Sequence, residues 1–495
     1  MSAISTLRTN MKLVTKLNKK GYGVSKSSLT DTELNNIRRT LTVSPRSNPG
    51  YDMGEEVSFP CYRENSKWIY VPKWYGIKTY GSVDEKKIDL GTDTPIQVEF
   101  CGTLREVQQE AVDKFFEGGS SNVNGGLLVL PCGFGKTVCA LHVIARAKTK
   151  TLVIVHKDFL LKQWKERIQQ YLPSARVGII KGKTCDVDDK DIVLGMLQSV
   201  SMKDYDSAVF DGFGLAIVDE VHHIAAEVFS RALHKINFKH TLGLSATPTR
   251  KDGLTKVIKW FLGDVVYKAS KRADKLIVES RHYYDDAPEY SQVHTMFNGR
   301  PNLSRMINSL CDHIPRTQHI IDIICEIKRH EPLRNIIVLS DRRNHLDQFA
   351  IGIRKCLKHS CVGFYVGGMK ERDLQNTEDT CDVILATYSM AAEAMDIPKL
   401  DTLILASPKG DVEQALGRIQ RKPMSERKYV PKVIDIVDNF SIFKTQHTKR
   451  LKHYKKMGYD VHEKDDESAQ DQNDHPSNLH IKSLLGICEA EPNKK

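Results

Sequence analysis

The sequence lacks several features of membrane, secreted and disulfide-stabilised proteins. It has no run of about 18 apolar residues, so nothing in it predicts a transmembrane helix. Residues 1–20 are basic and lack the apolar core of a secretory signal. The 11 cysteines are odd in number and form no Cys-x-x-Cys pair, which favours reduced thiols over a disulfide framework or a zinc site. We therefore expect an intracellular protein that is not secreted.

Acidic residues are also in deficit. The 73 Lys and Arg against 62 Asp and Glu leave a net charge of +11, which suggests a polyanionic partner such as nucleic acid. Residues 1–95 are basic, and short strands are expected at 67–72 and 74–76. Aromatic residues there stand beside lysines, a combination that suits stacking on bases. The alternative is a small β-rich module whose aromatic side chains form its own core.

The segment 127–147 has the pattern of a strand, a glycine loop and a helix, which is the context of a phosphate-binding loop. Gly133 and Gly135 let successive amides curl around an anion, and the helix N-terminus adds a positive dipole. Lys136 would reach the outer phosphates of ATP, and Thr137 would bind Mg²⁺. A glycine turn with an incidental lysine is the alternative. The candidate nucleotide-binding residues of this loop are Pro131, Cys132, Gly133, Phe134, Gly135, Lys136 and Thr137.

Strands alternate with helices after this loop, which predicts a parallel sheet with helices on both faces. Strands are expected at 151–156, 192–197, 215–218 and 241–244. Ligands of such sheets bind beyond the carboxyl ends of the strands. Asp219 and Glu220 follow one strand directly, so Asp219 can hold the Mg²⁺ bound by Thr137 and Glu220 can deprotonate the attacking water. His222 can link this site to the segment 245–247.

A second set of strands begins after residue 320, and residues 270–302 are polar enough to suggest a joint between two lobes. Arg418 and Arg421 are three residues apart in an expected helix and so lie on one face. Such a pair is usually only solvated, but here it could face a triphosphate as arginine fingers. Residues 462–474 are acidic and have the composition of a disordered segment.

Six segments, in order, resemble superfamily 2 helicases of DExH type. They are LPCGFGKT, TLVIVHKDFLLKQW, DEVHH, LGLSATPTRKDG, ILATYSMAAEAMDIP and QALGRIQR. The chain is most similar to the XPB-like branch, which includes transcription helicases of large DNA viruses, over roughly residues 98 to 460. The resemblance implies two tandem RecA-like lobes that share ATP. We expect an accessory module at 1–95, lobe 1 at 96–270, a joint at 271–302, lobe 2 at 303–460 and a disordered tail at 461–495.

The resemblance also implies roles for individual residues. Nucleotide contact or hydrolysis would involve Gln108, Lys136, Thr137, Asp219, Glu220, Gln414, Arg418 and Arg421, of which Gln108 can pair with the edge of adenine. Contact with nucleic acid, or coupling to it, would involve His156, Gln198, Ser199, His222, Ser245, Thr247, Thr387 and Asp396.

The leading functional hypothesis is an ATP- and Mg²⁺-dependent DNA helicase or translocase that acts as a monomer, in viral transcription or in replication and repair. One alternative is a remodelling factor that displaces transcripts or proteins without unwinding, and another is an RNA helicase. A viral protein of this kind could work in the cytoplasm, the nucleus or the virion.

Overall fold

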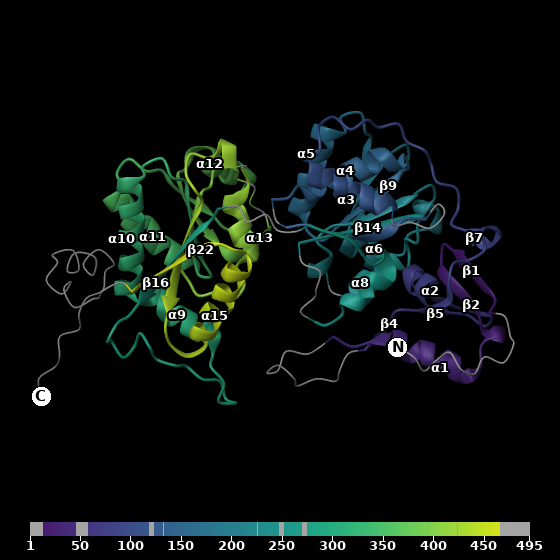
Figure 1. Cartoon of the computed structure of the whole chain (residues 1–495), viewed down its shortest axis with the longest axis horizontal. Helices are drawn as coiled ribbons and strands as arrows, with labels where there is room; N and C mark the ends of the chain where they lie inside the picture. The colour runs from purple at the N-terminus through teal and green to yellow at the C-terminus, as the bar shows by residue number, and fades with distance from the viewer. Residues whose placement is uncertain are drawn as a thin grey trace, which may run out of the picture. The chain divides into compact units, whose positions relative to one another are not determined.

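The computed structural model describes residues 13–45, 58–117, 123–131, 133–224, 226–246, 252–269, 275–393, 395, 397–422 and 424–465. The chain divides into two compact units, Met1–Ser270 and Lys271–Lys495. Each unit contains one large sheet flanked by helices (Figure 1). No described helix has the length and apolar character needed to cross a lipid bilayer.

The first unit contains an eight-stranded sheet in the order β11-β10-β12-β9-β13-β14-β8-β15. Neighbouring strands are parallel except for β10 and β11, which confirms the predicted parallel sheet. The strands are β8 (Gly125–Val129), β9 (Thr151–Val155), β10 (Val177–Lys181), β11 (Thr184–Asp186), β12 (Ile192–Met196), β13 (Leu215–Val218), β14 (His240–Ser245) and β15 (Val265–Lys268).

Both faces of this sheet are covered, so its central strands consist of continuous apolar runs. One face packs against α3 (Glu106–Glu117), α4 (Lys136–Ala147) and α5 (Asp158–Tyr171). The opposite face packs against α6 (Leu197–Met202), α7 (Ala226–Leu233) and α8 (Thr255–Leu262). Because these strands are parallel, their carboxyl ends all lie at one edge of the sheet, where the predicted polar segments begin.

The N-terminal part of this unit has a small mixed sheet in the order β5-β6-β2-β1-β7. Its strands are β1 (Thr15–Asn18), β2 (Gly21–Ser25), β5 (Arg63–Glu64), β6 (Trp68–Val71) and β7 (Ile88–Asp89). The helix α1 (Asp31–Leu41) begins with a capping box between Thr30 and Glu33. A short pair, β3 (Thr42–Val43) and β4 (Phe59–Pro60), follows it.

The strand expected at 74–76 is wrong, because these residues lie in the helix α2 (Lys73–Tyr80). Tertiary contacts favour the helix. Trp74 Nε1 donates to Thr241 Oγ1 at 2.8 Å, and the buried Lys73 Nζ donates to the Phe238 carbonyl at 2.7 Å. Gly76 packs so closely on Tyr22 that an added Cβ would lie 2.2 Å from its ring. The aromatic residues thus attach this module to the first large sheet.

The second unit contains a seven-stranded parallel sheet in the order β18-β19-β17-β20-β21-β16-β22. The strands are β16 (Ile277–Tyr283), β17 (Ile336–Ser340), β18 (Val362–Tyr365), β19 (Val383–Thr387), β20 (Thr402–Leu405), β21 (Lys432–Asp438) and β22 (Asp460–Asp465). The helices are α9 (Leu303–Asp312), α10 (Ile314–His330), α11 (Arg343–Cys356), α12 (Glu371–Thr380), α13 (Tyr388–Glu393), α14 (Glu413–Leu416) and α15 (Ser441–Lys456).

Two expectations about this unit are wrong. The proposed joint at 271–302 contains β16, and the first five residues of the proposed disordered tail at 461–495 belong to β22. Residues 466–495 lie outside the described residues. Both strands are polar, and β22 lies at the edge of the sheet. Ion pairs offset the charge: Glu279 of β16 contacts Lys432 at 3.1 Å and Lys464 at 3.4 Å. A strand recruited by distant backbone pairing need not carry an apolar pattern of its own.

A buried histidine in α11 makes the second unit sensitive to acid. Burial, together with Arg316, lowers the pKa of His345 to about 3. Because an unfolded histidine has a pKa of about 6.5, only the unfolded chain takes up this proton as the pH falls below that value. His345 should therefore cost the folded state about 2 kcal/mol between pH 7 and pH 5.

The unfolding free energy of wild type should fall between pH 7 and pH 5. In His345→Gln this fall should be smaller by about 2 kcal/mol. Hydrogen exchange of second-unit amides at pH 7 and pH 5 would measure the difference. The variant His359→Gln, at an exposed position, is the control and should behave as wild type. Equal pH dependence in wild type and His345→Gln would contradict the prediction.

Candidate nucleotide-binding site

The glycine loop connects β8 to α4 in the first unit. Gly133 and Gly135 have φ angles of 78° and 87°, which other residues adopt rarely. Gly135 stands at the N-cap of α4, and a Cβ on it would lie 2.5 Å from Gln108 Nε2. Lys136 and Thr137 form the first turn of α4. The loop is therefore a cradle of backbone that an added side chain would fill, at the positive end of a helix.

Leu130 replaces the glycine of the general phosphate-loop pattern, and the structure explains the difference. Its side chain is fully buried in the core between the sheet and α3–α5. Its amide donates to the Ser245 carbonyl at 2.9 Å. The loop turns one residue later, where Phe134 N donates to the Pro131 carbonyl at 3.2 Å. Cys132 lies outside the described residues.

Gln108 of α3 braces the loop. Its Nε2 donates to the Phe134 carbonyl at 2.7 Å, and its Oε1 accepts from the Arg105 amide at 2.9 Å. Arg105 also donates to the Phe134 carbonyl. Both ends of the Gln108 amide are thus engaged within the protein. An adenine edge would have to displace one of these partners to be read by Gln108.

Asp219 and Glu220 follow β13 at the same edge of the sheet. Asp219 is buried, and its Oδ2 accepts from Trp164 Nε1 at 2.8 Å while its Oδ1 accepts from the Glu220 amide at 2.9 Å. Burial raises the pKa of the Asp219 carboxyl and the Glu220 charge adds to this, whereas Trp164 and Lys136 oppose it. A buried carboxylate with a raised pKa is the kind of group that a cation would stabilise.

Lys136 and Glu220 form the central contact of the site. Lys136 Nζ lies 3.2 Å from Glu220 Oε1, with both side chains largely buried. Glu220 itself has a φ angle of 47°, an uncommon value for a residue with a side chain. The fold thus joins the end of the glycine loop to the end of β13, as the motifs predict.

His222 lies between Glu220 and the end of β14. Its Nδ1 is 2.9 Å from Ser245 Oγ and 3.5 Å from Glu220 Oε2. The predicted link to the segment 245–247 is therefore present as far as Ser245, and Thr247 lies outside the described residues. Sequence reasoning missed Trp164, which holds Asp219 from α5. In the sequence, only the position of Trp164 inside the segment TLVIVHKDFLLKQW could have indicated a role at the site.

The other first-unit candidates gather at strand ends on the same edge. His156 follows β9, and its carbonyl accepts from Gln198 Nε2 at 3.3 Å. The strand expected to reach residue 197 ends at Met196, so Gln198 and Ser199 lie in the first turn of α6. Ser199 Oγ accepts from the Gly182 amide at 2.9 Å.

Two of the second-unit candidates, Arg418 and Arg421, contact the Met395 carbonyl. Arg418 Nη1 donates to it at 2.5 Å and Arg421 Nη2 at 3.4 Å. The expected helix is short: Gln414 lies in α14, and a 3-10 turn, Gly417–Gln420, follows and brings both arginines to one side. Arg418 is buried, so it is not simply solvated. Thr387 Oγ1 lies 3.2 Å from Ser389 Oγ, and Asp396 lies outside the described residues.

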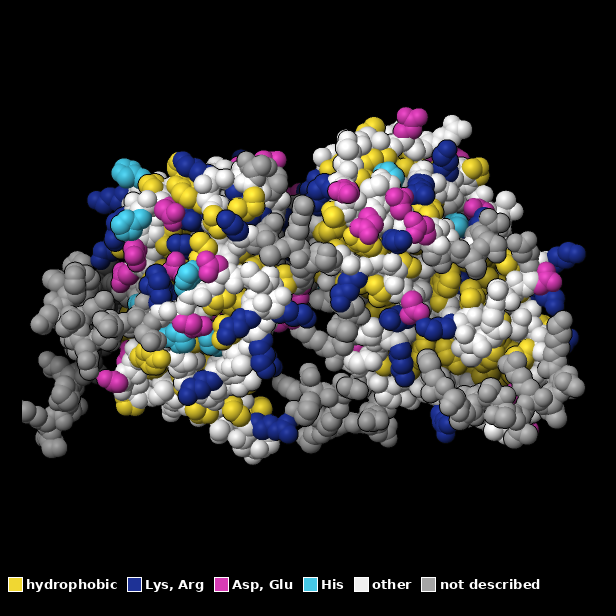
Figure 2. Space-filling model, in the orientation of Figure 1, with side chains coloured by type: hydrophobic (Ala, Val, Ile, Leu, Met, Phe, Trp, Pro, Cys, Tyr) yellow, Lys and Arg dark blue, Asp and Glu magenta, His cyan; other side chains and the backbone are white. Residues whose placement is uncertain are grey.

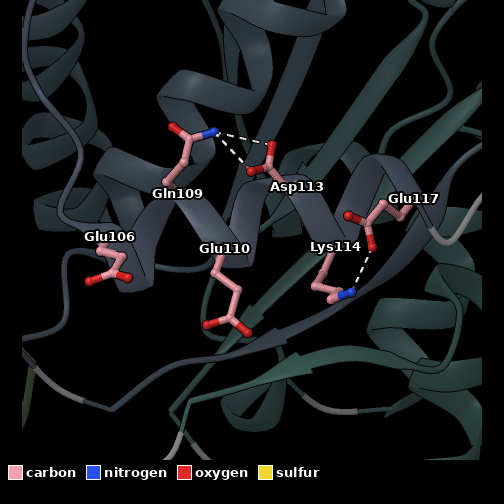
Figure 3. Close-up of a pocket in the computed structure, with 6 residues that line it drawn as sticks. All are labelled: Glu106, Gln109, Glu110, Asp113, Lys114 and Glu117. Atoms are coloured by element: carbon pink, nitrogen blue, oxygen red, sulfur yellow. Dashed lines mark hydrogen bonds and ion pairs between the residues drawn. The ribbon is translucent and has the colours of Figure 1, made fainter.

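A hollow along α3 is a poor alternative site for a nucleotide. Figure 3 shows that its lining is largely acidic, with Gln109 turned to Asp113 and Lys114 turned to Glu117. Glu110 accepts a hydrogen bond from Tyr267 at 3.0 Å. These carboxylates would repel a triphosphate, which leaves the glycine loop as the candidate site.

Comparisons with known proteins agree with the resemblance to helicases. Residues 102–250 match the family model described as the res subunit of type III restriction enzymes. A protein of Acanthamoeba polyphaga mimivirus, named as an ATP-dependent RNA helicase, is 35% identical over 457 residues that cover 90% of this chain and 86% of that protein. A protein of African swine fever virus with a similar name is 27% identical and covers 86% of each chain.

Two further matches are more partial or more distant. The DNA 3'-5' translocase XPB2 of Sulfurisphaera tokodaii is 36% identical over 227 residues, which cover 42% of this chain and 48% of that protein. The crystal structure of T4 UvsW aligns with a TM-score of 0.38 and 16% identity, covering 92% of this chain and all of that one.

Proposed function

The chain belongs to the family of ATP-dependent helicases found in large DNA viruses, and we propose that it uses ATP hydrolysis at the glycine loop to move along DNA. The observation that carries the proposal is the contact between Lys136 and Glu220, 3.2 Å long, beside the buried Asp219. In this proposal the Lys136 ammonium group would bind the phosphates and the Glu220 carboxylate would orient the attacking water. A lysine that binds phosphate and a carboxylate that orients water are two of the groups used in hydrolysis of a phosphoanhydride bond.

The residues around the loop fit a magnesium–nucleotide complex. Gly135 has no room for a side chain, because a Cβ there would lie 2.5 Å from Gln108 Nε2, and Gly133 has a φ angle of 78° that favours glycine. Thr137 and Asp219 would hold Mg²⁺, which when bound neutralises charge on the phosphates. Lys136 would exchange its partner Glu220 for phosphate oxygens, because both compete for one ammonium group. Nucleotide binding would thereby release Glu220 to orient and deprotonate water.

One observation supports DNA as the substrate, and two others support a nucleic acid of either kind. The relative named as a DNA 3'-5' translocase shares 36% identity over the part it covers. The net charge of +11 suits a phosphate backbone. Figure 2 shows Lys and Arg side chains spread over both units on the face in view, mixed with acidic ones. We therefore expect contact with phosphates along the strand and no reading of base sequence.

The nucleic-acid contacts remain predictions. His156, Gln198, Ser199 and Ser245 lie at the strand edge of the first unit, where a bound backbone could reach them. We propose that His222 transmits the state of Glu220 to Ser245. The resemblance adds Thr247, Thr387 and Asp396 to the strand contacts, and Gln414, Arg418 and Arg421 to the nucleotide contacts. A monomeric motor, and its place in the cytoplasm, nucleus or virion, also remain predictions.

An RNA helicase is the second candidate, because the mimivirus relative, which matches 90% of this chain, is named as one. Steady-state ATPase activity with single-stranded DNA, duplex DNA and RNA at equal nucleotide concentration separates the two. We expect DNA to stimulate hydrolysis more than RNA, and the stimulation to fall with salt. Lys136→Ala should remove hydrolysis under every condition. Stronger stimulation by RNA would keep the ATPase and overturn the substrate.

A further inference from the structure

We propose that His282, His447 and Glu463 form a binding site for one divalent transition-metal ion, with Zn²⁺ as the ion it takes. All three residues belong to the second unit, whereas the glycine loop belongs to the first. The site would be structural: it would fasten the edge strand β22 to β16 and α15, the elements that carry its ligands.

The fold brings the three side chains together from distant parts of the sequence. One ligand atom from each residue lies within 4.8 Å of the others. Glu463 pairs in register with Ser280, two residues before His282, so Glu463 and His282 share a face of the sheet. The helix α15 packs against β21 and β22 (Figure 1). Its His447 lies near the other two ligands.

The spacing of the ligand atoms suits a small ion. Glu463 Oε2 lies 2.6 Å from His282 Nε2 and 3.8 Å from His447 Nε2. Tetrahedral zinc with bonds near 2.0–2.2 Å separates its ligand atoms by about 3.3 Å. The first separation must therefore open and the second must close, each by less than about 1 Å. The third separation, between the two imidazoles, is at most 4.8 Å and would have to close by up to about 1.5 Å. Glu463 is half-exposed, which leaves a side for water as the fourth ligand.

The second nitrogen of each imidazole faces a group that would orient the ring. Nδ1 of His447 is buried without a hydrogen bond and lies 3.7 Å from Oδ2 of the buried Asp435. Asp435 is held by Arg450 at 2.8 Å and by the Tyr454 hydroxyl at 3.0 Å. A carboxylate behind a histidine raises its basicity and directs the other nitrogen to a metal.

The His282 ring has an equivalent partner. Its Nδ1 lies 2.8 Å from the Asn439 amide, which is also 2.8 Å from the Tyr284 hydroxyl. Amide oxygen and nitrogen are assigned from such contacts, so Asn439 can equally accept from Nδ1. With Nδ1 protonated and held by Asn439, the Nε2 lone pair points to Glu463. Two imidazoles and one carboxylate are a common ligand set of zinc.

The test uses the full chain after treatment with a chelator and removal of that chelator. We expect the wild type to bind one more zinc ion per chain than Glu463→Gln, and zinc to raise the melting temperature of the wild type more than that of the variant. His282→Gln and His447→Gln should resemble Glu463→Gln. The control His462→Gln changes an exposed histidine on the same strand and should behave as wild type.

Cobalt substitution separates this site from the cysteines, which could bind zinc elsewhere. Co²⁺ in the proposed site should give the visible spectrum of tetrahedral cobalt without a thiolate charge-transfer band. The Glu463→Gln variant should not show this spectrum. Equal zinc stoichiometry and equal melting shifts in wild type and Glu463→Gln would overturn the proposal. Because Glu463 is half-exposed, its variant should fold even if His447→Gln does not.

Discussion

Replacing Glu220 with glutamine is expected to reduce ATP hydrolysis by about 10²–10⁴-fold while preserving ATP binding. Glutamine keeps the shape of the side chain but cannot accept the proton of the attacking water. A positioned general base contributes about 10²–10⁴-fold to a rate, so the turnover number should fall by that factor. The change also frees Lys136 from its 3.2 Å ion pair, so affinity for ATP should stay equal or increase.

Binding of a fluorescent ATP analogue and steady-state phosphate release would measure the two properties separately. Glu227→Gln is a matched control, because Glu227 pairs with Arg231 on the surface of α7 in the same unit. This control should hydrolyse ATP as wild type does. Turnover in Glu220→Gln within tenfold of wild type would show that another group acts as the base.

Replacing Arg316 with methionine is expected to destabilise the second unit by about 3–5 kcal/mol. Arg316 is fully buried, and its Nε and Nη2 donate to the two carboxylate oxygens of Asp438 at 2.7 and 2.9 Å. Its Nη1 donates to the Ala406 carbonyl at 2.8 Å, and Tyr290 donates to Asp438 at 2.9 Å. Removing the cation leaves a buried carboxylate without its counter-charge, the most expensive state of such a pair.

Tryptophan fluorescence can show which unit loses stability. All four tryptophans lie in the first unit, so their fluorescence follows that unit alone. Arg316→Met should reduce hydrogen-exchange protection in the second unit and leave the tryptophan unfolding transition unchanged. Arg329→Met, at an exposed position of the same helix, should change stability by less than about 0.5 kcal/mol. A similarly small effect of Arg316→Met would contradict the account of this pair.

The site could be predicted where its functional residues come directly after a strand in the sequence. Lys136 and Glu220 were placed by the rule that parallel strands present their carboxyl ends at one edge, and the structure brings them into contact. Trp164 was missed as a partner of Asp219, because nothing local in α5 shows which residue its indole reaches. Gln108 was expected to face adenine, yet its amide holds the loop.

The errors in the fold have a common physical origin. The strands β16 and β22 carry charged residues because they pair with distant backbone near the sheet edge, and no local apolar pattern marks them. The helix α2 was expected as a strand because its aromatic residues favour strands, whereas their packing against Thr241 and Tyr22 favours a helix. His282, His447 and Glu463 are likewise adjacent only through this tertiary pairing.

The most direct test of the central claim is displacement of a third strand from duplex DNA. A motor that moves along the duplex dislodges this strand even if it does not separate the two strands of the duplex. A forked duplex with one labelled strand, assayed alongside, reports strand separation. We expect the wild type to displace it with ATP, and to fail without ATP or with Glu220→Gln. DNA-stimulated hydrolysis that displaces neither the third strand nor the fork strand would contradict movement along DNA and leave a remodelling ATPase.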